Sequence, residues 1–346
     1  MSKILYGVSG EGFGHAARSK EIISYLISKK HQVRVISYDR GFDFLSQFFD
    51  TEKIFGLKFT YKKNQVHYLE TMFDNLLKTP QAAKSLEKVK KITDDFKPDI
   101  VFTDFEPLSC IVANLRKIPL ISVDNQHILT RSDAKYPLRY KGEAMVAKLV
   151  TRLLIFKAKS YLILSFFNAK ASEDRTIILP PVVRKEVLKL TPHRGDYILV
   201  YFTSVADNVI EALKKSKKRF VVYGLNKKTD EGLISYRLYD QKNFLRDLSG
   251  ARAIVANAGF SLISEALYLG KPYLAIPAKS QFEQVLNAYQ LGKSGYGDWI
   301  KELTSAKIKD FERKLPVFEK KLANYPRQDN KVVFVEIDKI LKSFKK

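Results

Sequence analysis

The chain has 346 residues, of which 45% are hydrophobic and 12% aromatic, a composition that provides two hydrophobic cores and argues against a disordered protein. The single cysteine, Cys110, excludes an intramolecular disulfide and a cysteine cluster for zinc. Lys and Arg number 60 against 37 Asp and Glu, and the resulting net charge of +23 would attract nucleic acid, an anionic lipid surface or a phosphorylated substrate.

The first residues, MSKILYGVSG, predict a cytoplasmic protein, because one lysine leads directly into a short strand without the apolar region of a signal peptide. The sequence lacks an uninterrupted apolar stretch of roughly 18 residues, so we expect no membrane-spanning helix. It also lacks a recognisable DNA-binding or RNA-binding motif, so the charge alone does not predict a nucleic-acid partner.

The first elements form a βαβ unit, which implies a right-handed crossover and a parallel sheet. Its strand, glycine turn, helix and second strand cover residues 3–9, 10–15, 16–29 and 31–38. A dinucleotide site would need G-x-G-x-x-G and an acidic residue such as Asp39 after the second strand. Gly14, however, follows Gly12 by two residues instead of three. His15, which ends the turn, either faces a reaction or only supports the helix start.

Two later strands end in polar clusters. An amphipathic helix over 79–96 precedes a strand at 99–103 that ends in Asp104-Phe105-Glu106-Pro107, and a strand at 119–123 ends in Asp124-Asn125-Gln126-His127. Functional side chains gather at the carboxyl ends of parallel strands, which makes Asp104, Glu106, Asn125 and His127 candidates. The alternative is that these groups cap helices. Asp-x-Glu alone could bind a metal, but the parallel-sheet setting predicts no metal.

The segment from Arg131 to Tyr161 combines eight basic residues with a broad apolar face. A basic amphipathic helix can lie in a membrane interface, attracted by anionic headgroups and held by buried apolar side chains. It can equally be a connecting helix that is buried in its own domain. Both interpretations remain open at this point.

The second half repeats the architecture of the first. After strands at 161–165 and 176–179, the composition of residues 191–196 is that of a linker. A strand, a polar turn, a helix and a strand then follow over 197–202, 203–204, 207–216 and 220–224. We therefore predict an α/β protein with domains at 1–190 and 195–327 and a final helix at 330–346 that returns to the first. Ser204, in the polar turn, is a candidate phosphate contact.

The stretch from Ala251 to Gly297 contains the most specific pattern. A buried strand, the turn Asn257-Ala258-Gly259 and a helix start place free N–H groups of Gly259, Phe260 and Ser261 at one point, which favours a phosphate. Glu265 follows one turn later and could accept hydrogen bonds from ribose hydroxyls. Glu283 and Gln284 follow the next strand and could hold the hydroxyls of a sugar. The alternative is an ordinary α/β unit with solvated polar groups.

This stretch resembles the donor-binding half of GT-B glycosyltransferases. It is most similar to family 28, which includes the lipid-linked N-acetylglucosaminyltransferase of peptidoglycan synthesis and archaeal relatives. The matching residues are Asn257-Ala258-Gly259, Ser264-Glu265, Gly270-Lys271-Pro272, Pro277, Glu283-Gln284 and Asn287-Ala288. The resemblance implies two Rossmann-like domains that face each other across a cleft, with the donor bound by the second.

The resemblance also assigns roles. It implies that the helix start binds the donor diphosphate, Glu265 the ribose, and Glu283 with Gln284 the sugar. Gly12 and Gly14 would lie against the diphosphate, and Phe244 near the base. His15 matches the histidine that ends the family's glycine loop, although Glu11 and Phe13 depart from the commoner Gly-Gly-x-Gly-Gly-His. We expect His15 to act as the base and Asp104 to orient it.

The expected function is therefore that of an inverting, metal-independent glycosyltransferase without a cofactor. It would move a hexose or N-acetylhexosamine from a nucleoside-diphosphate sugar, with UDP as the expected nucleotide, to a lipid-linked or membrane-associated acceptor at the inner face of the cell membrane. Inversion is favoured because retaining enzymes of this fold carry a second Glu eight positions after the first, where this chain has Tyr273.

Two other functions compete with this one. A nucleotide-sugar epimerase would share the fold and much of the donor site. A basic nucleic-acid-binding protein would explain the net charge of +23, but it would leave Glu265, Glu283 and Gln284 without a purpose.

Overall fold

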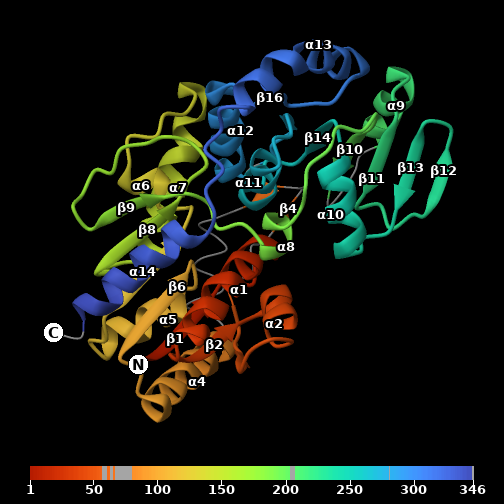
Figure 1. Cartoon of the computed structure of the whole chain (residues 1–346). Coiled ribbons are helices and arrows are strands. Elements are labelled where there is room, and N and C mark those ends of the chain that lie inside the picture. The colour runs from red at the N-terminus through yellow and green to blue at the C-terminus, as the bar shows by residue number, and fades with distance from the viewer. Residues whose placement is uncertain (57–60, 63–64, 67–79, 203–206, 280, 345–346) are drawn as a thin grey trace. The chain divides into compact units, whose positions relative to one another are not determined.

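The structure is a computed structural model that describes residues 1–56, 61–62, 65–66, 80–202, 207–279 and 281–344. The chain divides into two compact units, which appear in Figure 1. The first comprises Met1–Val182 and Asn330–Lys346, and the second comprises Val183–Asp329. Each unit is an α/β layer structure, as the sequence predicts.

The first unit contains a seven-stranded sheet with the order β3-β2-β1-β6-β7-β8-β9. Its strands are β1 Lys3–Val8, β2 Gln32–Ser37, β3 Thr51–Lys53, β6 Ile100–Asp104, β7 Leu120–Asp124, β8 Ser160–Leu164 and β9 Thr176–Leu179. All neighbouring pairs of this sheet run parallel. The strand order reverses between β1 and β6, and ligands of open parallel sheets bind at such a switch point, beyond the carboxyl ends of the strands.

Helices cover the sheet of the first unit, so its central strands are buried throughout and mostly apolar. Every residue of β6 and β7 is buried, which is typical of a parallel sheet with helices on both faces. The helices are α1 Phe13–Ser28, α2 Asp39–Leu45, α4 Pro80–Phe96, α5 Pro107–Leu115, α6 Ile128–Arg131, η1 Leu138–Tyr140, α7 Lys141–Leu154 and α14 Lys331–Ser343. A separate antiparallel pair consists of β4 Tyr61–Lys62 and β5 Gln65–Val66.

The last helix, α14, belongs to the first unit although it follows the second in sequence. The ring of Phe334 stacks on the ring of Tyr25 in α1, with centroids 4.1 Å apart. The Tyr25 hydroxyl also donates a hydrogen bond to Asp338 at 2.7 Å. A stacked aromatic pair and a hydrogen bond therefore fix the end of the chain to the first helix.

The second unit contains another seven-stranded sheet, with the order β12-β13-β11-β10-β14-β15-β16. Its strands are β10 Ile198–Tyr201, β11 Phe220–Tyr223, β12 Thr229–Glu231, β13 Ile234–Arg237, β14 Ala253–Ala256, β15 Tyr273–Ala275 and β16 Gly297–Trp299. Only the edge strand β12 runs antiparallel to its neighbour among the described pairs of this sheet. The switch point lies between β10 and β14.

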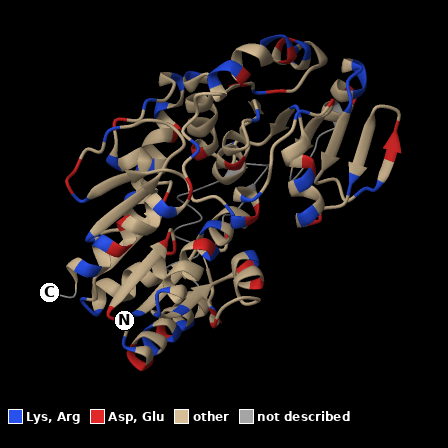
Figure 2. Ribbon diagram, viewed as in Figure 1, with Lys and Arg blue, Asp and Glu red and all other residues tan. Residues whose placement is uncertain are grey.

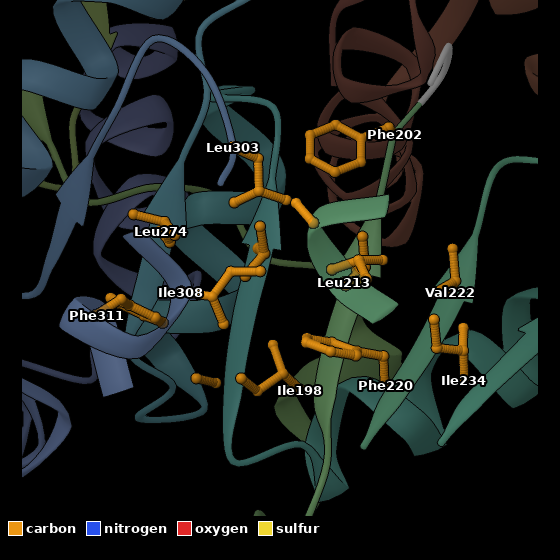
Figure 3. Packing of buried hydrophobic residues seen from close by; sticks show 14 of the residues in the cluster. Ile198, Phe202, Leu213, Phe220, Val222, Ile234, Leu274, Leu303, Ile308 and Phe311 are labelled. Atoms are coloured by element: carbon orange, nitrogen blue, oxygen red, sulfur yellow. The ribbon is translucent and has the colours of Figure 1, made fainter. Parts of the chain in front are cut away.

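The helices of the second unit are α8 Lys185–Leu188, α9 Asp207–Ser216, α10 Gln241–Gly250, α11 Phe260–Tyr268, α12 Phe282–Ser294 and α13 Ser305–Leu322. Figure 3 shows how part of this unit packs: Leu213 of α9 lies close to Phe220 of β11, and Ile308 of α13 faces the strands. In α13, the buried residues recur every three or four positions, which places them on one face of the helix. This core fixes the sheet whose carboxyl edge carries the candidate residues of the second unit.

The boundary between the units lies earlier than the sequence predicts. Residues 183–190, expected in the first domain, belong to the second unit. The reason is local, because Arg184 forms an ion pair with Glu265 of α11. A buried pair of this kind ties the segment to the sheet of the second unit.

Lys and Arg are spread over both units, as Figure 2 shows. Within the described ranges, no helix combines the length and the apolar character that are needed to cross a membrane.

Candidate active site

His15 and Asp104 meet at the switch point of the first sheet. His15 lies in the first turn of α1, which follows β1, and Asp104 is the last residue of the neighbouring strand β6. The Nδ1 atom of His15 is 2.7 Å from Oδ1 of Asp104. Asp104 is buried, whereas the His15 side chain keeps 13% of its surface exposed. The structure thus brings together the two residues that the sequence singles out for catalysis.

Arg18, one turn after His15, is a further member of this cluster. Its Nε and Nη2 atoms donate hydrogen bonds to the two carboxylate oxygens of Asp104, at 2.7 and 2.5 Å. Ser19 donates a third hydrogen bond to Asp104 at 2.9 Å. Burial alone would raise the pKa of Asp104, but the charges of Arg18 and His15 and their hydrogen bonds outweigh burial and lower it. Asp104 is therefore held as a carboxylate.

Nδ1 of His15 lies 2.7 Å from Asp104 and 2.9 Å from Nη2 of Arg18. Because the carboxylate contact is the shorter and a carboxylate only accepts hydrogen bonds, we assign the hydrogen to Nδ1. The other nitrogen, Nε2, then carries the lone pair of the neutral ring. The Nε2 atom of Gln126 lies 3.2 Å from this nitrogen. Because Arg18 neutralises Asp104, the cluster carries no net charge while the ring is neutral.

The three residues predicted to face an acceptor are engaged within the protein. Glu106 is fully buried and caps α5 by accepting hydrogen bonds from the N–H groups of Leu108 and Ser109; burial raises its pKa although these bonds oppose the change. Asn125 is buried and accepts a hydrogen bond from Arg18 at 2.6 Å. His127 is buried and pairs with Asp124. Helix capping accounts for Glu106, and a contact of these side chains with an acceptor stays a prediction.

Phe105, which separates Asp104 from Glu106, has a φ angle of 55°. A bulky side chain rarely adopts this left-handed conformation, and such strain tends to collect at functional sites. The strained residue turns the chain sharply between a carboxylate that faces the site and a glutamate that caps a helix.

The glycine loop leads into α1 without a side-chain cap. Gly12 is the residue before the helix, with φ of 78° and ψ of 165°, a conformation that is open to glycine alone. A Cβ atom at Gly12 would meet no atom within 4 Å, so the constraint is one of backbone conformation and not of space. Gly14 lies in the first helical turn. No side chain caps the start of this helix.

A second uncapped helix start lies at the switch point of the second unit. Gly259 precedes α11 without a side-chain cap, and a Cβ atom there would meet no atom within 4 Å. The Phe260 side chain is buried, so only its backbone N–H can serve a ligand, whereas Ser261 is half-buried. The helix start that the sequence predicts is therefore present and has no side-chain cap.

Side chains of α12 and β15 hold the turn before α11 through hydrogen bonds. The Gln284 side-chain oxygen accepts hydrogen bonds from the backbone N–H groups of Ala258 and Ala278, at 3.2 and 3.0 Å. Asn287 donates to the Ala258 carbonyl at 3.1 Å. Tyr273, fully buried in β15, donates to the Asn257 carbonyl. Gln284, predicted to bind the donor sugar, thus joins two loops in this structure, while Glu283 beside it is half-buried.

Glu265 is also engaged by the protein. Both of its carboxylate oxygens accept hydrogen bonds from Arg184, at 2.5 and 2.6 Å, and both residues are buried. Burial alone would lower the pKa of Arg184, but Glu265 and a hydrogen bond with Tyr239 raise it. A carboxylate has about four lone-pair sites, so a ribose hydroxyl could still share these oxygens.

Phe244, predicted to lie near the base, is buried in an aromatic cluster. Its side chain is only 2% exposed and packs among the rings of Tyr201, Tyr223 and Tyr239, with centroids 5.2–5.5 Å away. Tyr239 is 47% exposed at the edge of this cluster. The periodicity of α10 turns Phe244 into the core, so Tyr239 is the more accessible ring, and a contact of Phe244 with the base stays a prediction.

Ser204 lies outside the described residues. In the part of the chain that the structure describes, no three His, Cys, Asp or Glu side chains come together as a metal site.

The sequence profile of glycosyl transferase family 1 matches residues 2–316. The chain belongs to this family. An uncharacterized glycosyltransferase of Methanosarcina acetivorans is 21% identical over 348 residues, covering 88% of this chain and 87% of that protein. A UDP-N-acetylglucosamine–N-acetylmuramyl-(pentapeptide) pyrophosphoryl-undecaprenol N-acetylglucosamine transferase of Clostridium botulinum is 24% identical over 247 residues, covering 63% of this chain and 65% of that enzyme.

Solved structures show the fold of this glycosyltransferase. The glycotransferase of kitacinnamycin matches with a TM-score of 0.69 and 15% identity, over 94% of each chain. The calicheamicin glycosyltransferase matches with a TM-score of 0.67 and 15% identity, over 99% of this chain and 98% of that one. The fold is therefore GT-B, as the sequence predicts. These relatives support neither the epimerase nor the nucleic-acid-binding alternative.

Three side chains of this glycosyltransferase's site were missed by the sequence analysis: Arg18, Gln126 and Arg184. Arg18 left a signal, because it shares one helical face with His15, Ser19 and the buried Ile22, and a charged residue on a buried face needs a partner. Gln126 left one as well, because it belongs to the polar cluster that ends the strand at 119–123. Arg184 left none, because its partner is distant in sequence.

Proposed function

We propose that this glycosyltransferase moves a hexose or N-acetylhexosamine from a nucleoside-diphosphate sugar to a lipid-linked acceptor, with inversion and without a metal or cofactor. The contact between His15 Nδ1 and Asp104 carries the proposal, because it leaves His15 Nε2 as a base at a switch point. The Clostridium relative, named for a UDP-sugar donor and a lipid acceptor, supports UDP and a lipid-linked acceptor. It also supports the likeness to family 28.

In the proposed step, an acceptor hydroxyl gives its proton to Nε2 of His15 while its oxygen attacks the anomeric carbon of the sugar. The new carbon–oxygen bond forms as the bond to the nucleoside diphosphate breaks, and the diphosphate leaves with the electron pair. Asp104 stabilises the protonated ring and keeps its orientation. The proton then passes to solvent or to the departing phosphate. Attack from the face opposite the leaving group gives inversion.

The donor diphosphate is proposed to bind at the start of α11. Uncapped N–H groups and the positive end of a helix dipole favour negative charge, and they would stabilise the leaving group without a metal. Tyr239 is proposed to contact the base and Glu265 to share its oxygens with the ribose, while the exposed part of Glu283 meets the sugar.

A ligand screen tests the proposal. Ligand at about a hundred times its Kd should add roughly 2.7 kcal/mol of stability, which a thermal-shift experiment resolves. We expect a selective response to UDP among UDP, GDP, dTDP and NAD. A response to NAD alone would contradict the proposal and would indicate that the glycine loop binds a dinucleotide, as in a dehydrogenase.

The Gly259→Val variant tests the position of the diphosphate. With φ of −69° and ψ of 133°, the backbone accepts any side chain, and a Cβ atom meets no neighbour, so we expect the melting temperature to stay within about 1 °C. The affinity for UDP, measured by calorimetry, should fall about tenfold or more, because the side chain fills the space before the N–H groups. Gly142→Val is the control, since Gly142 also has open space but lies in α7. Equal affinity in both variants would place the diphosphate elsewhere.

The membrane part of the proposal rests on α7 and the 3-10 turn before it. This helix buries Ala144, Val150 and Leu154 against the first unit. Its other face exposes an apolar stripe made of Leu138, Met145, Leu149 and Leu153, of which Leu138 is 84% exposed. Exposed cations, Arg139, Lys141 and Arg152, accompany the stripe. Apolar side chains flanked by positive charge fit an anionic lipid surface.

The Leu149→Glu variant tests this face. We expect its binding to vesicles of phosphatidylglycerol, measured by sedimentation, to fall about tenfold, because one leucine loses roughly 1.5–3 kcal/mol of burial. Val317→Glu, which changes an exposed apolar residue of α13, should bind as the unchanged protein does. If the two variants bind equally, α7 is not the membrane contact.

A further inference from the structure

The segment that follows β7 is held in place on both sides of Gln126. Asp124 accepts hydrogen bonds from the backbone N–H of His127 at 2.9 Å and from Ser122 at 2.6 Å, and it pairs with His127 Nδ1 at 2.7 Å. Burial alone would raise the pKa of Asp124, but His127 and Ser122 lower it to about 2. Asn125 is held by Arg18. The backbone that carries Gln126 is thus fixed by two buried groups.

The side chain of Gln126 reaches back to the catalytic histidine. Its Nε2 atom is 3.2 Å from His15 Nε2, the nitrogen that the proposed step uses as the base. Since His15 Nδ1 gives its hydrogen to Asp104, His15 Nε2 can only accept in the neutral ring. The amide group of Gln126 is therefore the donor of this hydrogen bond, with its nitrogen turned toward His15.

We propose that Gln126 is a positioning residue that occupies the lone pair of His15 until the acceptor hydroxyl replaces it. The inference rests on the proposed function only in taking His15 as the base. An amide N–H and an acceptor O–H each donate one hydrogen to the same nitrogen, so the exchange conserves the number of hydrogen bonds on His15. Gln126 is half-buried and Asp104 is buried. The Gln126 side chain can therefore move away from His15 while Asp104 stays in place.

This arrangement has two effects on His15. A donor at Nε2 keeps the hydrogen on Nδ1, which is the tautomer that the transfer needs. It also limits the orientation of the ring, since both nitrogens are then engaged. Gln126 thereby keeps His15 in the tautomer that can act as the base. Once the acceptor displaces the Gln126 amide from His15, that amide can donate a hydrogen bond to the acceptor oxygen.

Nitrogen NMR of the imidazole rings tests the inference in the full chain without substrate. The sequence contains five histidines, so labelled rings give few signals, and a His15→Gln variant assigns that of His15. We expect the unchanged protein to show Nε2 as the unprotonated nitrogen. Gln126→Leu, which removes the donor, should shift the nitrogen signal of His15 Nε2, because that nitrogen no longer accepts a hydrogen bond. Gln126→Glu, which places a carboxylate there, should put a hydrogen on Nε2, because a carboxylate only accepts.

Two results would overturn the inference: a hydrogen on Nε2 in the unchanged protein, or an equal Nε2 signal of His15 in all three proteins. The signal of His31, whose Nδ1 accepts from the Ser2 backbone N–H, is the internal control and should not move. These readouts do not depend on transfer. A protein that shows the shifts but binds no nucleotide would contradict the proposed function and leave the role of Gln126 standing.

Discussion

Replacing His15 with alanine is expected to reduce sugar transfer by about 10²–10⁴-fold, the range by which a positioned general base accelerates a reaction. The variant loses the one nitrogen that the Asp104 contact leaves free to accept a proton. The affinity for UDP should stay unchanged, because the residues proposed to bind the donor base and ribose belong to the second unit. Initial rates of donor consumption with a saturating acceptor, combined with calorimetry of UDP binding, measure both quantities.

Two further variants sharpen this experiment. Asp104→Asn should also lower the rate, because an amide can turn its N–H toward His15 and shift the hydrogen to Nε2. His31→Ala changes a histidine of the same unit, outside the switch point, and should leave the rate unchanged. A His15→Ala rate within about threefold of normal would show that His15 only binds, as would suit an acceptor phosphate that is already ionised.

Replacing Arg18 with methionine is expected to lower the free energy of unfolding of the first unit by about 3–5 kcal/mol. The buried carboxylate of Asp104 would lose two hydrogen bonds and its cation, and it would remain away from water. The matched control is Arg116→Met. Arg116 also binds a carboxylate, Asp94, at 2.6 and 2.8 Å, but this pair is 41% and 50% exposed, so solvent screens it and the change should cost much less stability than Arg18→Met.

The two units can be followed separately in this experiment. The chain has one tryptophan, Trp299, in β16 of the second unit, so its fluorescence reports the unfolding of that unit alone. Circular dichroism reports both units. Arg18→Met should move only the part of the transition that tryptophan does not follow, and equal losses in Arg18→Met and Arg116→Met would contradict the buried-charge argument.

The pH dependence of the same variant has a defined sign. In the unchanged protein, the folded-state pKa of Asp104 lies below 3.8, the ordinary value of an aspartate. Its ionised form therefore contributes stability at pH values above 3.8. This contribution is lost as the pH falls through the folded-state pKa. The difference in stability between the unchanged protein and Arg18→Met should therefore be largest near neutral pH and should shrink in acid.

Much of the fold follows from the order of strands and helices in the sequence. The alternation of apolar strands with helices predicts two parallel sheets, and the ends of such strands predict that His15 and Asp104 lie at one edge. The start of α11 also follows, because a small-residue turn between a buried strand and a helix leaves N–H groups free. These features depend on neighbours along the chain, which the sequence displays directly.

The remaining features depend on partners that are far apart in the sequence. The sequence predicts that Glu265 contacts a ribose, but it does not show that Arg184, 81 residues away, donates hydrogen bonds to both of its oxygens. The sequence predicts that Gln284 contacts a sugar, but it does not show that the backbone N–H of Ala258 donates to its oxygen. In both cases, a polar side chain at a sheet edge already forms hydrogen bonds within the protein. Only the geometry decides how much of that side chain is left for a ligand.

The return of α14 to the first unit sets the order in which the protein can be completed during synthesis. The second unit is continuous in sequence and has all its residues once Asp329 has left the ribosome. The first unit begins earlier and ends later, because Phe334 and Asp338 must still reach Tyr25. The apolar face of α1 near Tyr25 thus remains exposed until the residues of α14 are made. A chain truncated before residue 330 would leave that face open to water.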